Sequence, residues 1–324
     1  MNTKLLEIKN LSIHFKTFFG LAKAVRNLDL YINKGEILGL VGESGCGKSI
    51  TARSILSLLK TPPAILPNGE IFYKNERIFP SSKEKIREIR GKEISMIFQE
   101  PMTSLNPVMK IGKQLDEVFV SHYGKKGDYK DQIISLFKKV GIPDSEKRYN
   151  VYPHQLSGGL RQRVMIAMAL AFNPGLLIAD EPTTALDVTI QAQILDLIQE
   201  LRDKSDMSVL MITHDLGVIS EIADRINVMY AGKIVEVSEV NTLLDRPKHP
   251  YSEGLINSIP DIDLEHKRGA RLNTLKGTVP ELYNVPPGCP FSNRCPKIMK
   301  VCTEKEPVLK MRPDGNSVAC WLYE

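Results

Sequence analysis

Hydrophobic residues along this chain follow strand and helix periods in turn. The segment 5–15, LLEIKNLSIHF, alternates apolar and polar positions, which predicts an edge or half-exposed strand. We expect further strands at four short apolar runs: 37–42, 94–98, 175–180 and 208–213. We expect helices from Lys48 to Lys60, on both sides of a polar stretch (124–128) within 110–140, after 157–159, and from about Thr189 to Arg202. The segment 226–237 predicts a hairpin with its turn at 231–233.

Strands that alternate with helices predict an α/β fold, with a mostly parallel sheet wrapped by helices and antiparallel strands attached. The pattern changes near residue 245, where Pro, Gly and Cys become frequent and long periodic segments disappear. We therefore expect two regions, residues 1–245 and residues 246–324.

Composition narrows the class of protein. The chain is 42% hydrophobic and 25% charged, as is ordinary for a globular protein. Its longest apolar run, Val164 to Phe172, is half of what a membrane span requires, and its N-terminus lacks the apolar core of a signal peptide. The net charge of +5 is mild, and in 81–93 basic residues alternate with acids, as on a solvated helix face. We expect a cytoplasmic protein that does not bind nucleic acid.

A glycine-rich segment, GESGCGKS (42–49), follows the first apolar run and precedes a predicted helix. The pattern G-x-x-x-x-G-K-[ST] is that of a phosphate-binding loop, in which glycines let backbone N–H groups converge on phosphate oxygens. A glycine-rich turn without a ligand is the alternative, which the flanking strand and helix disfavour. Lys48 is expected to reach the β- and γ-phosphates, and the Ser49 hydroxyl to ligate Mg²⁺. The residues expected to contact ATP are Gly42, Glu43, Ser44, Gly45, Cys46, Gly47, Lys48, Ser49 and Ile50, with Cys46 as a small filler and not a nucleophile.

Two acids end the apolar run LLIADE (176–181). Asp180, at the carboxyl end of the predicted strand, is placed to hold Mg²⁺ directly or through water. Glu181 then points to where a water attacks the γ-phosphate, as a general base or water-orienting group. Strand ends are often acidic, so these two acids indicate a nucleotide site only in combination with the phosphate loop.

The segment LSGGLRQR (156–163) resembles the signature sequence of ATP-binding-cassette (ABC) ATPases. Other family elements follow in order: Gln99 resembles the Gln loop, ALD (185–187) the D-loop, and His214 the switch histidine. The resemblance covers about residues 5–240. It implies a RecA-like mixed sheet core, an antiparallel β subdomain and a helical subdomain at about 105–172. Leu160 departs from the family, in which Gln is usual, so its side chain is not expected to contact nucleotide.

The resemblance also implies how the site works. Two cassettes pair head to tail, and Ser157, Gly158, Gly159 and Asp187 act on the ATP of the partner. His214 contacts the γ-phosphate, beside the catalytic Glu181, and Gln99 senses Mg²⁺ or the attacking water. Phe19 is expected to stack on adenine, with Phe15 and Phe18 as alternatives. For His214 the structural alternative is a helix-capping or surface histidine.

Segments 246–260, 275–282 and 286–296 look like the C-terminal extension of oligopeptide, dipeptide and nickel importer ATPases, most of all the peptide importers' D-type subunit. This implies an ATPase that energises uptake of di- or oligopeptides from the cytoplasmic face of the cell membrane. The implied partners are two membrane permease subunits, a second cassette (a related F-type subunit, or a second copy in isolation), and indirectly an extracytoplasmic peptide-binding protein. A nickel or other small-solute importer is one alternative; a redox-sensing regulatory protein that uses the cassette as a nucleotide switch is another.

Four of the five cysteines lie near the C-terminus: Cys289, Cys295, Cys302 and Cys320, spaced C-x5-C-x6-C-x17-C. Disulfides are not expected in a reducing cytoplasm. Zinc sites usually use tight C-x2–4-C pairs, which are missing here, so the spacing favours a [4Fe–4S] cluster over Zn²⁺. Some dipeptide-importer ATPases carry such a cluster on matching cysteines. Arg294, Lys297 and Lys300 are expected to offset its negative charge. Four unrelated buried thiols are the alternative.

Overall fold

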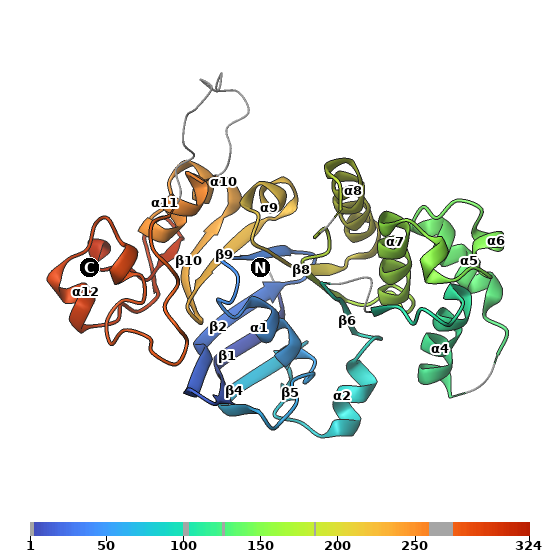
Figure 1. Cartoon of the computed structure of the whole chain (residues 1–324), viewed down its shortest axis with the longest axis horizontal. Helices are drawn as coiled ribbons and strands as arrows, with labels where there is room; N and C mark the ends of the chain where they lie inside the picture. Colours follow the sequence, from blue (N-terminus) through green and yellow to red (C-terminus); the bar gives the residue numbers. More distant parts are fainter. Residues whose placement is uncertain (1–2, 100–103, 125–126, 185, 259–274) are drawn as a thin grey trace, which may run out of the picture.

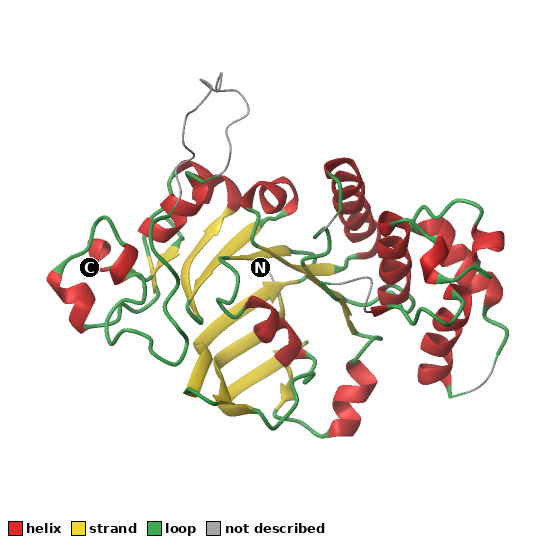
Figure 2. Ribbon diagram, viewed as in Figure 1, coloured by secondary structure: helices red, strands yellow, loops and turns green. Residues whose placement is uncertain are grey.

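The computed structural model describes residues 3–99, 104–124, 127–184, 186–258 and 275–324, and its strands form two sheets (Figures 1 and 2). The strands are β1 (Lys4–Thr17), β2 (Gly20–Asn33), β3 (Ile37–Val41), β4 (Ala64–Tyr73), β5 (Glu76–Phe79), β6 (Ile94–Ile97), β7 (Leu176–Asp180), β8 (Ser208–Thr213), β9 (Arg225–Tyr230), β10 (Lys233–Glu239), β11 (Lys310–Met311) and β12 (Ser317–Val318).

The larger sheet is mixed, with the strand order β11-β12-β10-β9-β3-β8-β7-β6. Strands β6, β7, β8, β3 and β9 are parallel neighbours, and β10 turns back along β9. Ala231 and Gly232 make that hairpin turn with positive φ values of 43° and 85°. The predicted parallel sheet with antiparallel strands attached is therefore confirmed.

The smaller sheet is antiparallel, in the order β2-β1-β4-β5. Of the two alternatives for residues 5–15, the half-exposed strand is confirmed and the edge strand is not, because β1 pairs with both β2 and β4. The alternation arises because Leu6, Ile8 and Ile13 are buried in the core while intervening side chains face outward. One solvated face gives an interior strand the same period as an edge strand.

The helices are α1 (Lys48–Ile55), α2 (Lys83–Ile89), α4 (Ile111–Tyr123), α5 (Lys130–Lys139), α6 (Ser145–Arg148), α7 (Gly158–Ala169), α8 (Val188–Ser205), α9 (Leu216–Ile222), α10 (Val240–Asp245), α11 (Pro250–Ile256) and α12 (Lys300–Glu304), with 3₁₀ turns at Pro153–Gln155, Ser292–Arg294 and Trp321–Tyr323. The expected helix from Lys48 to Lys60 is too long. It closes at Ile55 because Ser57 turns to φ 49° and the Leu58 N–H bonds back to the Arg53 carbonyl.

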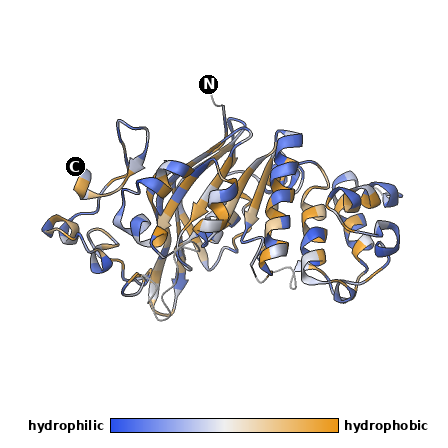
Figure 3. Ribbon diagram, turned by 90° about the horizontal axis from the view of Figure 1, so that it is seen from above, coloured by the Kyte–Doolittle hydropathy of each residue, from blue (hydrophilic) through white to orange (hydrophobic). Residues whose placement is uncertain are grey.

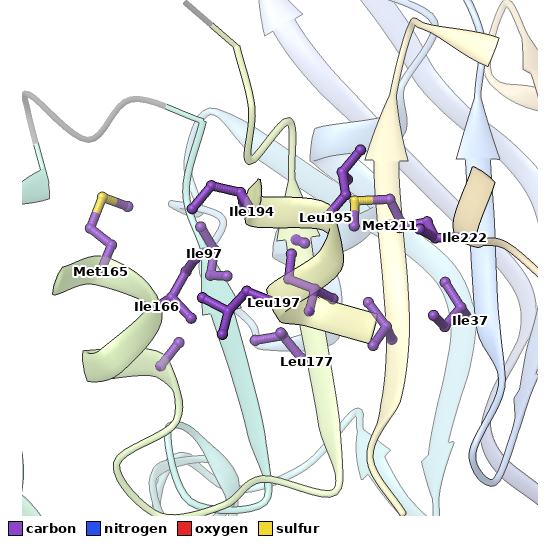
Figure 4. Close-up of a cluster of buried hydrophobic side chains, with 14 of the residues drawn as sticks. Ile37, Ile97, Met165, Ile166, Leu177, Ile194, Leu195, Leu197, Met211 and Ile222 are labelled. Atoms are coloured by element: carbon purple, nitrogen blue, oxygen red, sulfur yellow. The ribbon is translucent and has the colours of Figure 1, made fainter. Parts of the chain in front are cut away.

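Apolar side chains pack on both faces of the larger sheet. Figure 4 shows one cluster, in which α7 contributes Ile166 and α8 contributes Ile194 and Leu197 against the strands. In Figure 3 the apolar colour gathers on the strands of the centre, whereas the helices show both colours. Among the described residues, none of the helices combines the length and apolar composition needed to cross a bilayer.

The segment after residue 245 returns to the sheet. Strand β12 pairs with β10 through Glu236–Val318 and Val237–Ser317, and β11 pairs with β12. In Figure 1 this segment lies at the left end of the molecule, opposite helices α4 to α7 at the right. The boundary near residue 245 and the helical subdomain at about 105–172 stay predictions.

Candidate nucleotide site

Four parallel strands end at the same edge of the larger sheet, and each is followed by a candidate residue. The phosphate loop follows β3, His214 follows β8, Asp180 and Glu181 end β7, and Gln99 follows β6. In open α/β sheets, ligands bind outside the carboxyl ends of the strands. The motifs that are scattered over 170 residues of sequence are thus neighbours in space.

The backbone of the phosphate loop requires its glycines. Gly42 and Gly47 have φ values of 154° and 111°, and a Cβ at these positions would lie 2.1 Å from the Met229 carbonyl oxygen and 2.5 Å from the Ala24 carbonyl oxygen. Gly47 is the N-cap of α1 and supplies no side chain to cap it. The first amides of α1 are therefore not occupied by a side-chain cap, which suits an anionic ligand.

Polar side chains of the loop have partners within the chain. Lys48 is buried, and its Nζ donates to the carbonyl oxygens of Gly42 at 2.7 Å and Glu43 at 3.1 Å. The Ser49 hydroxyl donates to Asp180 Oδ1 at 2.8 Å. Cys46 is fully buried, and burial raises the pKa of its thiol, as fits a filler better than a nucleophile.

Asp180 carries the feature that best fits a bound cation. The residue is fully buried, and its Oδ2 has no hydrogen-bond partner among the described residues. Burial raises the pKa of this carboxyl. The unpartnered carboxylate oxygen of Asp180 and the Ser49 hydroxyl beside it are two oxygen ligands of the kind that Mg²⁺ prefers. Asp180, Ser49 and Gln99 are the residues that could hold it.

Glu181 is the centre of a hydrogen-bonded group at the strand ends. Its Oε2 accepts from Gln99 Nε2 at 2.8 Å and from the Thr184 hydroxyl at 3.0 Å, and its Oε1 lies 3.2 Å from His214 Nδ1. Glu181 has a φ of 49°, which is uncommon for a residue with a side chain. Burial acts to raise the pKa of Glu181, but the hydrogen bonds with His214 and Thr184 outweigh it and leave the pKa below its usual value. The carboxylate is thus ionised and oriented, as a general base needs to be.

The signature residues lie at the start of α7, beside the start of α8. Ser157 caps α7, with its hydroxyl accepting from the Leu160 N–H at 3.4 Å. A Cβ at Gly158 would meet Leu186 at 3.6 Å and one at Gly159 would meet Ile190 at 2.7 Å, so both glycines lie beside the start of α8. Asp187 caps α8 by accepting from the Ile190 N–H at 2.9 Å. Ala185 of the ALD motif lies outside the described residues.

The candidate adenine-stacking residues differ in exposure. Phe18 and Phe19, at the tip of the β1–β2 hairpin, are 99% and 74% exposed, whereas Phe15 packs against the core. Phe19 stacks on Tyr283 with ring centroids 5.8 Å apart. The role of Phe19 at adenine stays a prediction.

Two residues that motif reasoning missed contact the phosphate loop from the C-terminal segment. The Arg294 guanidinium forms an ion pair with the Glu43 carboxylate at 2.6 Å, and the Glu43 N–H donates to the Tyr251 hydroxyl at 2.8 Å. Neither residue belongs to a pattern with a phosphate-binding mechanism, so no signal in the sequence pointed to them. The expectation that Arg294 serves the cysteines is wrong in this respect, because its charge is paired with Glu43.

The four C-terminal thiols lie within electrostatic reach of one another. Burial raises the pKa of Cys289 to about 12, and the neighbouring thiols Cys302, Cys320 and Cys295 add to the shift. Burial also raises the pKa of Cys295 and that of Cys320. Within the described ranges, however, no three His, Cys, Asp or Glu side chains are close enough to hold a metal ion. Neither a cluster nor a zinc site is supported by this arrangement alone.

Comparisons with known proteins agree with the geometry. The family model "ABC transporter" matches residues 25–184, and "Oligopeptide/dipeptide transporter, C-terminal region" matches residues 235–302. The chain is 49% identical to the dipeptide transport ATP-binding protein DppD of Bacillus subtilis, over 99% of this chain and 95% of that protein. It is 50% identical to the oligopeptide transport ATP-binding protein OppD of Bacillus subtilis, over 99% of this chain and 89% of that protein. A solved dimeric structure of the ATP-binding cassette MJ0796, bound to ADP and Pi in a post-hydrolysis state, superimposes with a TM-score of 0.64 at 27% identity, covering 72% of this chain and 98% of that one.

Proposed function

The chain belongs to the family of ABC transporter ATP-binding proteins that carry the oligopeptide/dipeptide C-terminal region, and we propose that it hydrolyses ATP to energise uptake of di- or oligopeptides through membrane permease subunits. The observation that carries the ATPase assignment is the group at the strand ends, where the phosphate loop meets Asp180 and where Gln99 and His214 meet Glu181. The names of the relatives support the peptide substrate.

Each residue at the strand ends has an assigned task in hydrolysis. Glu181 accepts the proton of the attacking water as the water oxygen bonds to the γ-phosphorus. The bond from that phosphorus to the bridging oxygen breaks, and ADP leaves with its electron pair. Thr184 and His214 orient Glu181, and Gln99 holds the water or Mg²⁺.

Lys48 and the amides of the phosphate loop bind the triphosphate. Lys48 exchanges its present bonds to two loop carbonyls for the β- and γ-phosphate oxygens. Asp180 and Ser49 would hold Mg²⁺, which when bound neutralises phosphate charge. The unpartnered Oδ2 of Asp180 supports this assignment.

A second cassette completes the site. Ser157, Gly158 and Gly159 at the start of α7, with Asp187 beside them, close over the γ-phosphate held by the partner. The partner is a related F-type subunit in the assembled transporter and a second copy in isolation. Two permease subunits place the pair at the cytoplasmic face of the cell membrane, and an extracytoplasmic binding protein supplies the peptide.

The substitution Glu181→Gln tests the ATPase assignment. It removes the base but keeps the shape of the side chain, so we expect ATPase turnover to fall about a thousandfold while MgATP still binds and an ATP-bound dimer accumulates. Phosphate release and size-exclusion chromatography with ATP measure both effects. Glu200→Gln, an exposed carboxylate on α8 paired with Lys204, is the matched control and should behave as wild type. Unchanged turnover in the Glu181 variant would refute its role.

The peptide assignment is tested separately, on the chain assembled with its permease in vesicles. Labelled di- or oligopeptide should accumulate only when MgATP is present on the side of the cassettes. Accumulation of Ni²⁺ in place of peptide would favour the nickel-importer alternative.

We propose further that Cys289, Cys295, Cys302 and Cys320 bind a [4Fe–4S] cluster. A zinc site with Zn–S bonds of about 2.3 Å needs its thiolates about 4 Å apart, and such a group is missing from the described residues. A cubane takes one thiolate on each iron and so accepts thiolates farther apart. The proposal rests on this difference in spacing and on the nearness of the four thiols to one another, which raises the pKa of Cys289 and that of Cys320 beyond the effect of burial.

Iron and acid-labile sulfide per chain, measured after anaerobic purification, test the cluster. We expect about four irons per chain in wild type and a large loss in Cys295→Ser, whereas Cys46→Ser should keep them. Folded, fully active protein without iron would contradict the cluster, and stoichiometric zinc would favour Zn²⁺.

A further inference from the structure

The C-terminal segment reaches the phosphate loop through one buried arginine. Arg294 Nη1 lies 2.6 Å from Glu43 Oε2, and Nη2 lies 2.9 Å from Glu43 Oε1, so the pair is bidentate. The two residues are 251 positions apart in the sequence. Glu43 is the second residue of the loop, directly after Gly42.

Arg294 is held in place on its other sides. Its side chain is 3% exposed, its Nε donates to the Lys276 carbonyl at 3.0 Å, and its Nη1 also lies 3.3 Å from the Tyr230 hydroxyl. A guanidinium fixed by bonds at both ends of its planar group has little rotamer freedom left to lose. The arginine is therefore a rigid anchor for a carboxylate that is itself more exposed.

Glu43 is held by its backbone as well. Its N–H donates to the hydroxyl of Tyr251, which is buried in α11 and packs against Tyr230. The C-terminal segment thus contacts the side chain and the amide of one loop residue. Contacts at two points restrict the loop more than either contact alone.

We propose that Arg294 is a positioning residue for nucleotide binding, which acts by neutralising and fixing Glu43 at the mouth of the phosphate loop. The inference rests on the proposed function, because it assumes that the triphosphate binds there. A carboxylate beside the loop repels an anionic ligand unless a cation compensates it. Arg294 supplies that cation from the same chain and keeps the loop in one arrangement before ATP arrives, which lowers the entropy lost on binding.

The test is a double-mutant cycle on the full-length chain, with the dissociation constant for MgATP measured by titration and kcat measured separately. Arg294→Gln leaves the Glu43 charge uncompensated, and we expect about tenfold weaker MgATP binding with a kcat close to wild type. Glu43→Gln removes the charge, so the variant with both substitutions should recover to within about threefold of wild type. Removal of a purely structural contact would not be reversed by loss of its partner.

Two further variants keep the result interpretable. Lys310→Gln breaks another ion pair of the same segment, with Glu324 at 2.9 Å, and should leave MgATP affinity unchanged. Arg294→Lys keeps the charge but loses the bidentate geometry, and should fall between wild type and Arg294→Gln. Unaltered affinity in folded Arg294 variants, or no recovery in the double variant, would overturn the inference. A wild-type chain that binds no MgATP would instead overturn the proposed function.

Discussion

Helices α1 and α7 both start at a glycine, with Gly47 as the N-cap of α1 and Gly158 as the first residue of α7, and the surroundings of the two starts differ. At α1, Ser44 and Gly45 of the glycine-rich loop are exposed, but Lys48 is buried against the loop and Ser49 bonds to Asp180. At α7, Gly158 is exposed, and Ser157 bonds only weakly to its own helix, at 3.4 Å from the Leu160 N–H. Both helix starts offer amide groups and a hydroxyl to an anion.

The two helix starts differ in where the other groups that bind the ligand come from. The α1 site has a lysine and a carboxylate of the same chain for a phosphate and its cation. The α7 site has the Ser157 hydroxyl and the exposed Gly158, beside the start of α8. A ligand for α7 is therefore best supplied by another molecule, as in the proposed pair of cassettes.

The largest effect is expected from the α1 side. Lys48→Ala removes the positive charge of the loop that is proposed to bind the triphosphate, so MgATP affinity should fall about a hundredfold and turnover should be lost. Nucleotide titration and phosphate release measure these effects. Lys60→Ala, an exposed lysine beyond α1, is the control and should match wild type. An affinity within threefold of wild type in Lys48→Ala would remove the contrast between the two helix starts.

A smaller, more selective effect is expected from the α7 side. Gly158→Asp adds a negative charge where, among the described residues, a Cβ meets only Leu186 at 3.6 Å, so the fold should tolerate it. We expect MgATP affinity of the isolated chain within about twofold of wild type, but turnover about thirtyfold lower and no ATP-dependent dimer. Gly158→Ala, which adds bulk without charge, should lose less.

Mixing Lys48→Ala with Gly158→Asp sharpens the same comparison. A dimer of the two contains one complete site, made by the loop of the second chain and the α7 start of the first. Turnover of the mixture should therefore rise above that of either variant alone. The absence of this rise, with dimers demonstrated by light scattering, would contradict a site shared between chains.

The smallest expected effect is on stability and concerns α11, whose Tyr251 contacts the phosphate loop. His249 caps α11, which carries Tyr251, and its buried Nδ1 accepts from the Tyr251 N–H at 3.0 Å. Burial lowers the pKa of His249 from 6.5 to about 3. Between these values the unfolded chain binds a proton that the folded chain excludes, so stability is lost as the pH falls below 6.5.

The free energy of unfolding should therefore be about 1 kcal/mol lower at pH 5.5 than at pH 7.5 on account of this residue. Urea titrations at both pH values compare wild type with His249→Asn, which keeps a capping oxygen. The difference between the two proteins separates the pH dependence due to His249 from that due to Glu236 and other groups. Equal pH dependence in both proteins would show that His249 does not supply it.

The motifs of the α1 site could be predicted from the sequence because each depends on local chemistry. A buried apolar run followed by GESGCGKS, or ending in Asp180 and Glu181, indicates a strand and the polar residues at its end within about ten positions of sequence. The family resemblance implied that Gln99, Glu181 and His214 lie together, and the structure brings them together because β6, β7 and β8 are adjacent parallel strands that end at one edge. The family resemblance supplied the role of α7.

The tertiary structure alone decided where the C-terminal segment goes. Periodicity reports which side of an element is buried but not what covers it, so an edge position stayed open for β1 and Arg294 was expected to be a partner for nearby cysteines. The bond from Arg294 to Glu43 joins residues 251 positions apart, and no local rule of charge or spacing selects one such pairing among many. Only the packing of α11 and the cysteine-bearing loop against β9 and β10 brings that arginine to the phosphate loop.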